Sequence, residues 1–202
     1  VNATGPLGVG DPTGTSTLTV TGAGSTLNAL SSLVIGDTSC GCGLIGTLTV
    51  ADGGVVNSPG FTGIAQGSTL NLGVGGLAGA INAPAIDNEG QIVANFTDTL
   101  TLAANISGLG TLSKAGVGTL ILTGNNSYAG GTTLTGGFIN FNSANSFGSG
   151  LITINGGGLP WATGNSADIS AQLAAVGAAG GAAMCIPRDL GTVRNPAPCA
   201  AM

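Results

Sequence analysis

The chain has 202 residues, of which 5% are charged and 39 are glycine, and it contains no histidine. Globular domains typically have about 25% charged residues and about 7% glycine, so this composition excludes most enzyme classes. Three basic residues, Lys114, Arg188 and Arg194, stand against eight acidic ones, and the net charge is -5. No basic patch is available to neutralise a run of phosphates, and we expect no nucleic-acid partner.

The mean hydropathy of +0.49 raises the question of a membrane segment. A spanning helix needs about 20 mostly apolar residues in a row. The longest uncharged stretch of the N-terminal half, residues 53–86, is interrupted by polar residues such as Asn57, Gln66 and Asn71, so we expect no membrane-spanning segment. The chain starts at Val1 without a basic or apolar leader, which predicts a piece of a longer protein whose signal peptide is absent or removed.

Ten segments are predicted to be short β-strands, because apolar and polar residues alternate in them. In chain order they cover residues 17–20, 33–35, 47–50, 69–72, 92–96, 99–102, 119–122, 133–135, 138–142 and 151–155. Four of these segments are variants of the tetrapeptide TLTV. Each variant places its two leucine or valine residues on one face and threonine on the other, apart from Ile121. Glycine and asparagine lie between the strands and predict tight corners.

Short strands with one apolar face and tight corners predict an all-β solenoid, in which each coil stacks only on its neighbours. A narrow parallel β-helix has room for aliphatic side chains of similar size, and leucine, valine and isoleucine dominate here, with aromatic residues at 3%. A two-sheet sandwich is the alternative. It requires larger core side chains and hairpin turns of fixed type.

The residue pattern and the composition of the sequence change near the C-terminus. Apolar residues within 166–176 recur at helical spacing, with Ser166 or Asp168 as a cap, and predict a helix. Beyond it the chain is rich in alanine, glycine and proline. We therefore expect a repeat region over residues 1–173 and a short non-solenoid tail over 174–202, poorly ordered or helical in part.

The segment ISGLGTLSKAGVGTLILTGNNSYAGGTTLTGGFI, residues 106–139, resembles the autotransporter-associated β-strand repeat of bacterial autotransporter passenger domains. The matching residues are Gly108, Gly110, Leu112, Lys114, Gly116, Gly118, Leu120, Leu122, Gly124, Asn126, Tyr128, Gly130, Thr132 and Gly137. Two further stretches, 16–73 and 155–173, are similar to weaker repeats and follow-on segments of related type V secreted proteins.

This resemblance implies a right-handed, single-stranded parallel β-helix on the bacterial cell surface, associated with the outer membrane or released outside the cell. It also implies a passenger fragment that acts as a structural stalk or adhesion scaffold, without catalysis and without a cofactor or metal. The partners it implies are a ligand on a host or neighbouring cell, either protein or glycan. Open solenoid ends are exposed β-edges, so we also expect self-association.

The main alternative is a polysaccharide-cleaving β-helix enzyme. Asp87 and Glu89 are the closest pair of carboxylates, and such enzymes use clustered acids supported by basic residues, which are missing nearby. Residues 115–167 contain no Asp, Glu, Lys, Arg or His, so that region lacks the usual general acids and bases. Most of the eight carboxylates follow or precede turn-forming residues and are interpreted as turn residues. GVGDPTG, which starts at Gly8, lacks the repeat that a calcium site needs.

The four cysteines are candidates for two small disulfides, Cys40 with Cys42 and Cys185 with Cys199. Two thiolates without histidine or a second pair cannot complete a tetrahedral metal site. The Cα atoms of a Cys-x-Cys pair in an extended strand lie about 7 Å apart, at the limit for bridging, so a bent corner is required.

Two further sets of residues allow a binding role. Thr15, Thr17, Thr19 and Thr21 resemble the threonine rows of ice-binding solenoids, but threonine is also a favourable solvent-facing strand residue, and Ile121, Asn140 and Asn142 end the array. Tyr128 and Trp161 are candidate platforms for sugars. The alternative places Tyr128 at a corner of the repeat and Trp161 over the last coil as an end cap.

Overall fold

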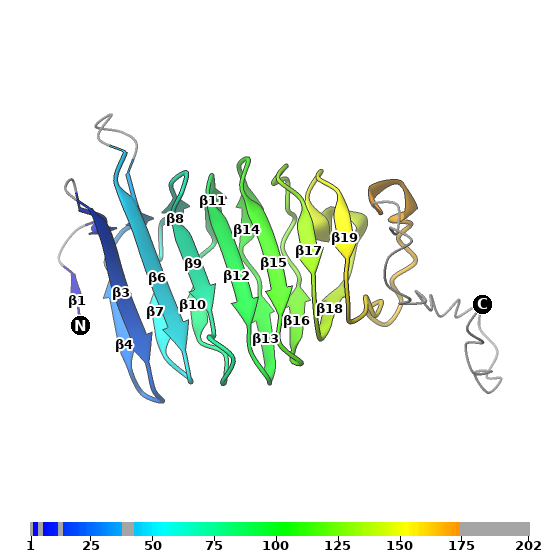
Figure 1. Ribbon diagram of the computed structural model, residues 1–202, viewed down its shortest axis with the longest axis horizontal. Helices are drawn as coiled ribbons and strands as arrows, with labels where there is room; N and C mark the ends of the chain where they lie inside the picture. Colours follow the sequence, from blue (N-terminus) through cyan, green and yellow to red (C-terminus); the bar gives the residue numbers. More distant parts are fainter. Residues whose placement is uncertain (1, 4–5, 12–13, 38–42, 174–202) are drawn as a thin grey trace.

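The computed structural model describes residues 2–3, 6–11, 14–37 and 43–173 (Figure 1). Within these ranges the chain forms parallel β-strands wound into a solenoid of about six coils. Two 3₁₀ turns, η1 (Ala144–Phe147) and η2 (Ser170–Gln172), are present, and the described part contains no α-helix. The predicted parallel β-solenoid is confirmed, and the sandwich alternative is wrong.

The strands stack into three faces, named here A, B and C. Face A consists of β1 (Asn2–Ala3), β4 (Thr26–Ala29), β7 (Val55–Asn57) and β10 (Ala80–Asn82), followed along the axis by β13 (Thr99–Leu102), β16 (Thr119–Leu122) and β18 (Phe138–Phe141). Face B consists of β2 (Leu7–Val9), β5 (Leu33–Ile35), β8 (Phe61–Ile64), β11 (Ala85–Asn88) and β14 (Asn105–Ser107). Face C consists of β3 (Thr15–Thr21), β6 (Ile45–Ala51), β9 (Thr69–Leu72), β12 (Gln91–Asn95), β15 (Thr111–Ala115), β17 (Thr132–Leu134) and β19 (Ile152–Ile154).

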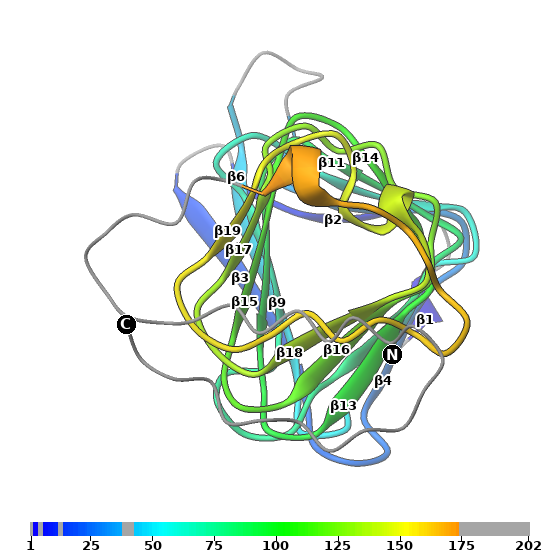
Figure 2. The ribbon, with the colours of Figure 1, turned by 90° about the vertical axis from the view of Figure 1, so that its right-hand side faces the viewer.

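The solenoid is right-handed. Figure 2 looks along its axis from the C-terminal end, with β2 at the top, β3 at the left and β4 at the lower right. The chain therefore turns anticlockwise as it approaches the viewer, which is the sense of a right-handed coil. This is the handedness that parallel strands joined by crossover connections adopt in nearly all proteins.

The coils become shorter and more regular along the chain. On face C, Thr15 of the first coil pairs with Ile45, whereas Thr47 of the second coil pairs with Thr69, which is separated from it by fewer residues along the sequence. From face B of the fourth coil onward the separation is nearly constant. The register partners there are Ala85 with Asn105, Gln91 with Thr111 and Thr132 with Ile152. Residues 106–139, which carry the resemblance, lie within this regular part.

The core is a set of columns of aliphatic side chains, one residue per coil. On face C, Leu48, Leu70, Ile92 and Leu112 pair in register, and all are buried. Burying one such side chain contributes about 1.5–3 kcal/mol. Because each side chain packs on those of the coils above and below, this energy is gained only when neighbouring coils are in register.

Asparagine side chains link the coils by hydrogen bonds. On face A, Asn57 Nδ2 donates to Asn28 Oδ1 at 2.7 Å, and Asn82 Nδ2 donates to Asn57 Oδ1 at 2.8 Å. Asn126 is buried and bridges three coils, because its Oδ1 accepts from the Ile106 N–H at 2.8 Å and its Nδ2 donates to the Ser146 carbonyl at 2.6 Å. These contacts supplement the backbone pairing between coils.

All ten predicted strands are present within one or two residues of their expected bounds. Nine further strands of the described chain were not predicted: β1, β2, β4, β7, β8, β10, β11, β14 and β15. Most of these are only two to four residues long, and they contain Asn, Gly or Ala where the predicted strands have Leu or Val. Their pairing within the stack, rather than local propensity, makes them strands.

The helix predicted over 166–176 is wrong in its described part, where η2 is a single 3₁₀ turn. Asp168 Oδ1 accepts a hydrogen bond from the Ser170 N–H at 2.9 Å, which forms a local turn in place of a helix cap. Ile169 is buried in the core, and Leu173 forms a parallel bridge with Ile152. The apolar residues of this segment thus extend the stack. Residues 174–202, the predicted tail, lie outside the described residues.

Trp161 lies on the last coil. Its ring centroid is 5.0 Å from that of Phe141, which in turn lies 4.9 Å from Phe147. The Trp161 Nε1–H donates to the Ala167 carbonyl at 3.1 Å. This aromatic group covers the end of the aliphatic column at the position where an end cap was expected.

Lys114 is fully buried inside the solenoid, which the sequence did not indicate. On β15 it occupies an inward column whose other described members are apolar: Val20, Val50, Leu72, Ala94, Leu134 and Ile154. Its Nζ donates to the carbonyls of Ala115 and Gly116, the latter at 3.1 Å, and lies 4.8 Å from the centre of the Phe96 ring. Desolvation lowers the pKa of this ammonium to about 8.

We predict that Lys114 makes the stability of the fold rise with pH between about 8 and about 10.5. In this range the folded state has lost the proton, because its pKa is about 8, whereas the unfolded chain keeps it up to the ordinary lysine pKa. The unfolded state thus binds more protons, so raising the pH favours folding. Lys114→Met keeps the length without the charge and should remove this component.

The measurement is the free energy of unfolding by denaturant, for both chains, from pH 7 to 9.5. Burial raises the pKa of Tyr128, so its hydroxyl opposes folding only above about pH 10, outside this range. The difference in free energy of unfolding between the parent chain and Lys114→Met should change steadily with pH above 8. A difference that is constant across the range would contradict the assigned ionisation of Lys114.

The constant period of the later coils predicts that one coil can be removed without loss of the fold. Deletion of residues 99–118 joins Asp98 to Thr119, the register partner of Thr99, so the remaining strands of faces A and C meet equivalent neighbours. Since stability is a sum over neighbouring coils, we expect cooperative melting within about 10 °C of the intact chain. Deletion of residues 99–108, half a coil, shifts the register and should abolish the cooperative transition in circular dichroism. Equal effects of the two deletions would refute the assigned register.

Candidate functional site

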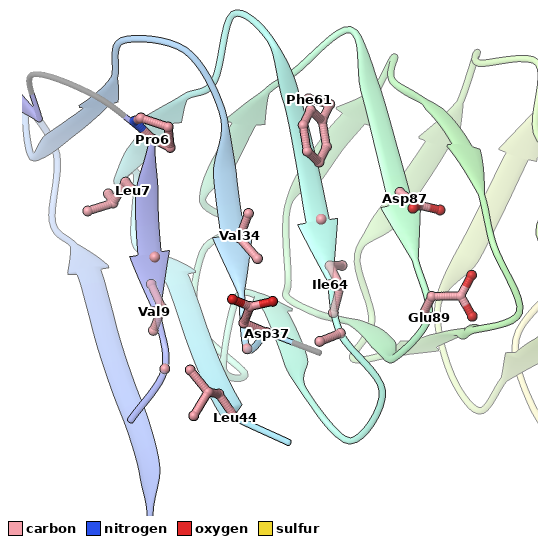
Figure 3. A pocket seen from close by; sticks show the side chains of 15 residues that line it. Pro6, Leu7, Val9, Val34, Asp37, Leu44, Phe61, Ile64, Asp87 and Glu89 are labelled. Atoms are coloured by element: carbon pink, nitrogen blue, oxygen red, sulfur yellow. The ribbon is translucent and has the colours of Figure 1, made fainter. Parts of the chain in front are cut away.

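A groove with a volume of about 580 Å³ lies on face B and crosses β2, β5, β8 and β11 (Figure 3). It is lined by Pro6, Leu7, Gly8, Val9, Gly10, Val34, Gly36, Asp37, Leu44, Phe61, Gly63, Ile64, Ala65, Asp87 and Glu89. Within the described part of the chain, every side chain of this lining is apolar or acidic.

The groove is present because small residues coincide in the outward columns of face B. Gly8, Val34 and Gly63 pair in register across three coils, and Gly63 also pairs with Asp87. An added Cβ at Gly8 would meet no atom within 4 Å, and one at Gly63 would meet only Phe61 at 3.4 Å and Val34 at 4.0 Å. The space above these glycines is therefore open.

Phe61 and three carboxylates flank the open floor. Phe61 on β8 is 48% exposed, which is unusual for a phenylalanine in a folded chain. Asp87 and Glu89 belong to the fourth coil and lie on the β11 side (Figure 3), while Asp37 lies on the side of Leu44. Asp87 Oδ1 accepts from the Ser107 hydroxyl at 3.3 Å. The two acids that the sequence singled out are thus on a concave surface.

No basic side chain of the described residues accompanies these acids. Lys114 is enclosed in the core, and Arg188 and Arg194 lie outside the described ranges. A polysaccharide-cleaving mechanism of the kind considered for Asp87 and Glu89 relies on such a group to stabilise developing charge. The groove therefore has acceptors and apolar surface, but within the described chain it lacks the electrophilic partner.

Three other carboxylates lie at corners, where Asp52 and Asp98 accept hydrogen bonds from the neighbouring coil and Asp168 forms a local turn. Asp52, at φ 50°, accepts from the Leu77 N–H and from the Thr21 hydroxyl, both at 3.2 Å. Asp98 accepts from the Ala78 N–H at 2.9 Å. Hydrogen bonds from Ser170 hold the pKa of Asp168 below its ordinary value.

Tyr128 is not a platform for sugars, because it is fully buried. Its hydroxyl lies 2.6 Å from that of Thr132. Burial raises the pKa of the phenol, so the group stays neutral at physiological pH. Trp161 is half-buried against Phe141, which leaves part of its ring accessible.

The threonine rows of face C extend over several coils. Thr17, Thr47 and Thr69 pair in register, as do Thr19 and Thr49. The second row continues with Asn71, whose Nδ2 donates to the Thr49 hydroxyl at 3.2 Å, and then with Val93. The threonine rows therefore lose their regularity at Asn71 and Val93, earlier in the chain than Ile121, where the sequence predicted the end of the array.

The candidate disulfide residues Cys40, Cys42, Cys185 and Cys199 lie outside the described residues, so both pairings stay predictions. Over the described ranges, His, Cys, Asp and Glu nowhere form a group of three or more that could hold a metal ion. No helix of the described residues has the length and apolar character needed to cross a membrane.

Comparisons with known proteins find similarity to autotransporters. Residues 112–140 match the family profile of the passenger-associated-transport-repeat. The chain is 37% identical over 171 residues to the "Adhesin BmaC autotransporter" of Brucella suis biovar 1 (strain 1330), an alignment that covers 73% of this chain and 5% of that relative. No solved structure matches the chain.

The profile match lies almost wholly within residues 106–139, on which the resemblance was based, and it covers the coil that contains Lys114, Asn126 and Tyr128. Both matches support the expected location at the cell surface, associated with the outer membrane, or outside the cell. The chain spans only about one twentieth of the length of the adhesin it matches. This chain therefore carries an autotransporter passenger repeat, over residues 112–140.

Proposed function

We propose that this segment is a non-catalytic part of a surface adhesin, in which the regular coils act as a stiff stalk and one face carries the adhesive surface. The observation that carries the proposal is the in-register stacking of about six coils around a continuous aliphatic core. Such a rod transmits position and load along its axis because each coil is fixed to the next by backbone pairing.

The distribution of charge supports a scaffold. Asp52, Asp98 and Asp168 are engaged in corner hydrogen bonds, and Lys114 is buried. Face C exposes mainly Thr, Ser and Asn, which suit a long solvent-facing sheet. The similarity to a protein named as an adhesin supports a binding role for the parent protein.

The proposal predicts attachment without turnover. Beads coated with the 202-residue chain should attach to cultured mammalian cells or to bacterial cells several-fold more than albumin-coated beads, because the described outward faces are accessible on the isolated rod. The chain should release no reducing ends from a panel of acidic and neutral polysaccharides.

Two outcomes would contradict the proposal. Bead attachment equal to that of albumin on every cell type would remove the adhesive role. Release of reducing ends that is lost in the double variant Asp87→Asn, Glu89→Gln, with Asp168→Asn as an unaffected control, would establish an enzyme. Asp168 suits this control because it is an exposed carboxylate outside the groove.

A further inference from the structure

We propose that the groove on face B binds an extended polypeptide segment in which a lysine or arginine stands next to an apolar side chain. This inference names the partner of the proposed adhesive surface and therefore rests on the proposed function. It places the adhesive surface on β2, β5, β8 and β11 rather than on the regular coils.

The chemistry of the lining selects a ligand that donates hydrogen bonds. Among the described residues, the polar side chains that line the groove are the carboxylates of Asp37, Asp87 and Glu89, which accept hydrogen bonds and carry negative charge when ionised. The described lining contains no side-chain donor. A ligand with many hydroxyl groups, such as a neutral glycan, needs donors as well as acceptors and would leave its own acceptors unpaired. An ammonium or guanidinium needs acceptors alone.

The apolar part of the lining selects a cation attached to an apolar body. Val34 lies between Gly8 and Gly63 on the floor, and Phe61 and Leu44 flank it. Burying a leucine or valine side chain there gains free energy in proportion to the area removed from water. The half-exposed ring of Phe61 also offers a face to a cation. A small hydrophilic cation would pair with the carboxylates of the groove but would leave its apolar surface exposed to water.

The dimensions of the groove suit an extended chain. It crosses four neighbouring strands, and strands in a sheet are about 4.8 Å apart, so it runs for about 14 Å along the solenoid axis. An extended polypeptide advances about 3.3 Å per residue, so about four residues fit. Small residues line the groove over three coils and the acids of the fourth coil end it on the β11 side, so a basic side chain at one end of the peptide would meet Asp87 and Glu89.

Gly63 provides a variant that fills the groove without disturbing the fold. It lies on β8 outside the left-handed region, and its Cβ position is open to ordinary contacts. Valine is a favourable strand residue, so Gly63→Val should fold normally and occupy the floor. Gly14→Val is the matched control, because Gly14 is equally open and lies outside the groove.

The test measures the binding of fluorescein-labelled hexapeptides to the 202-residue chain by fluorescence anisotropy. A peptide that carries leucine and lysine two residues apart, so that both side chains lie on one face of the extended chain, should bind saturably, and binding should weaken with added salt. Gly63→Val and the double variant Asp87→Asn, Glu89→Gln should each weaken binding by about tenfold or more. Gly14→Val and Asp168→Asn should bind as the parent chain does, and thermal melts of all variants verify folding.

Several results would overturn the inference. They are a failure of the lysine–leucine peptide to saturate, unchanged binding in the double variant, and equal affinity for a lysine–serine peptide or for spermidine, which would indicate charge alone. If a neutral oligosaccharide binds the parent chain and this binding is lost in the Gly63→Val variant, the groove would be assigned to glycans instead.

The bead assay separates this inference from the proposed function. Beads coated with Gly63→Val that attach as well as the parent chain would overturn the groove as the adhesive surface and leave the adhesin role intact. Peptide binding that is lost in Gly63→Val, together with no attachment of parent-coated beads, would support the groove and remove the adhesive role.

Discussion

In-register parallel pairing between successive coils is the constraint on which the rest of this structure depends. A single coil has no core of its own, because its inward side chains pack mainly on those of the coils above and below. The period therefore fixes which residues meet. Leu48, Leu70, Ile92 and Leu112 form one column only because they fall at the same place in consecutive coils, and a shift of one residue would turn the column toward solvent.

The same constraint explains how polar groups are accepted inside the stack. Asn126 supplements the backbone pairing where the regular strand of face B is missing after β14, and it satisfies both a donor and an acceptor in adjacent coils. Lys114 reaches two carbonyls at the corner that follows its own strand. A buried charge without such partners would cost several kcal/mol. These residues sit where a coil closes, and they connect the corner to the core.

The fold class was predictable from the sequence because alternation and corner glycines are local signals. The assignment of strands to faces was not. The TLTV of residues 17–20 and 47–50 lies on face C, but the TLTL of 99–102 lies on face A, so similar tetrapeptides do not mark the structural period. Strands such as β7 and β14 depend on pairing partners in the preceding coil, far outside their own local sequence. The burial of Lys114 was missed because residues 111–115 were not among the predicted strands; once they form β15, Lys114 lies two residues after the buried Leu112 and therefore on the same, inward face.

The groove also could not be predicted from local sequence patterns, because its residues belong to four coils whose lengths vary: Gly8, Val34, Gly63 and Asp87. That variation has a structural consequence. In the later coils the separation of register partners is nearly constant, which suits a stalk. In the first four coils the separation of register partners changes from one coil to the next, and outward columns of small residues lie beside longer corners. A concave surface can arise there without a break in the core, so the irregular coils are the part of the rod that can acquire a binding specificity while the regular coils keep it straight.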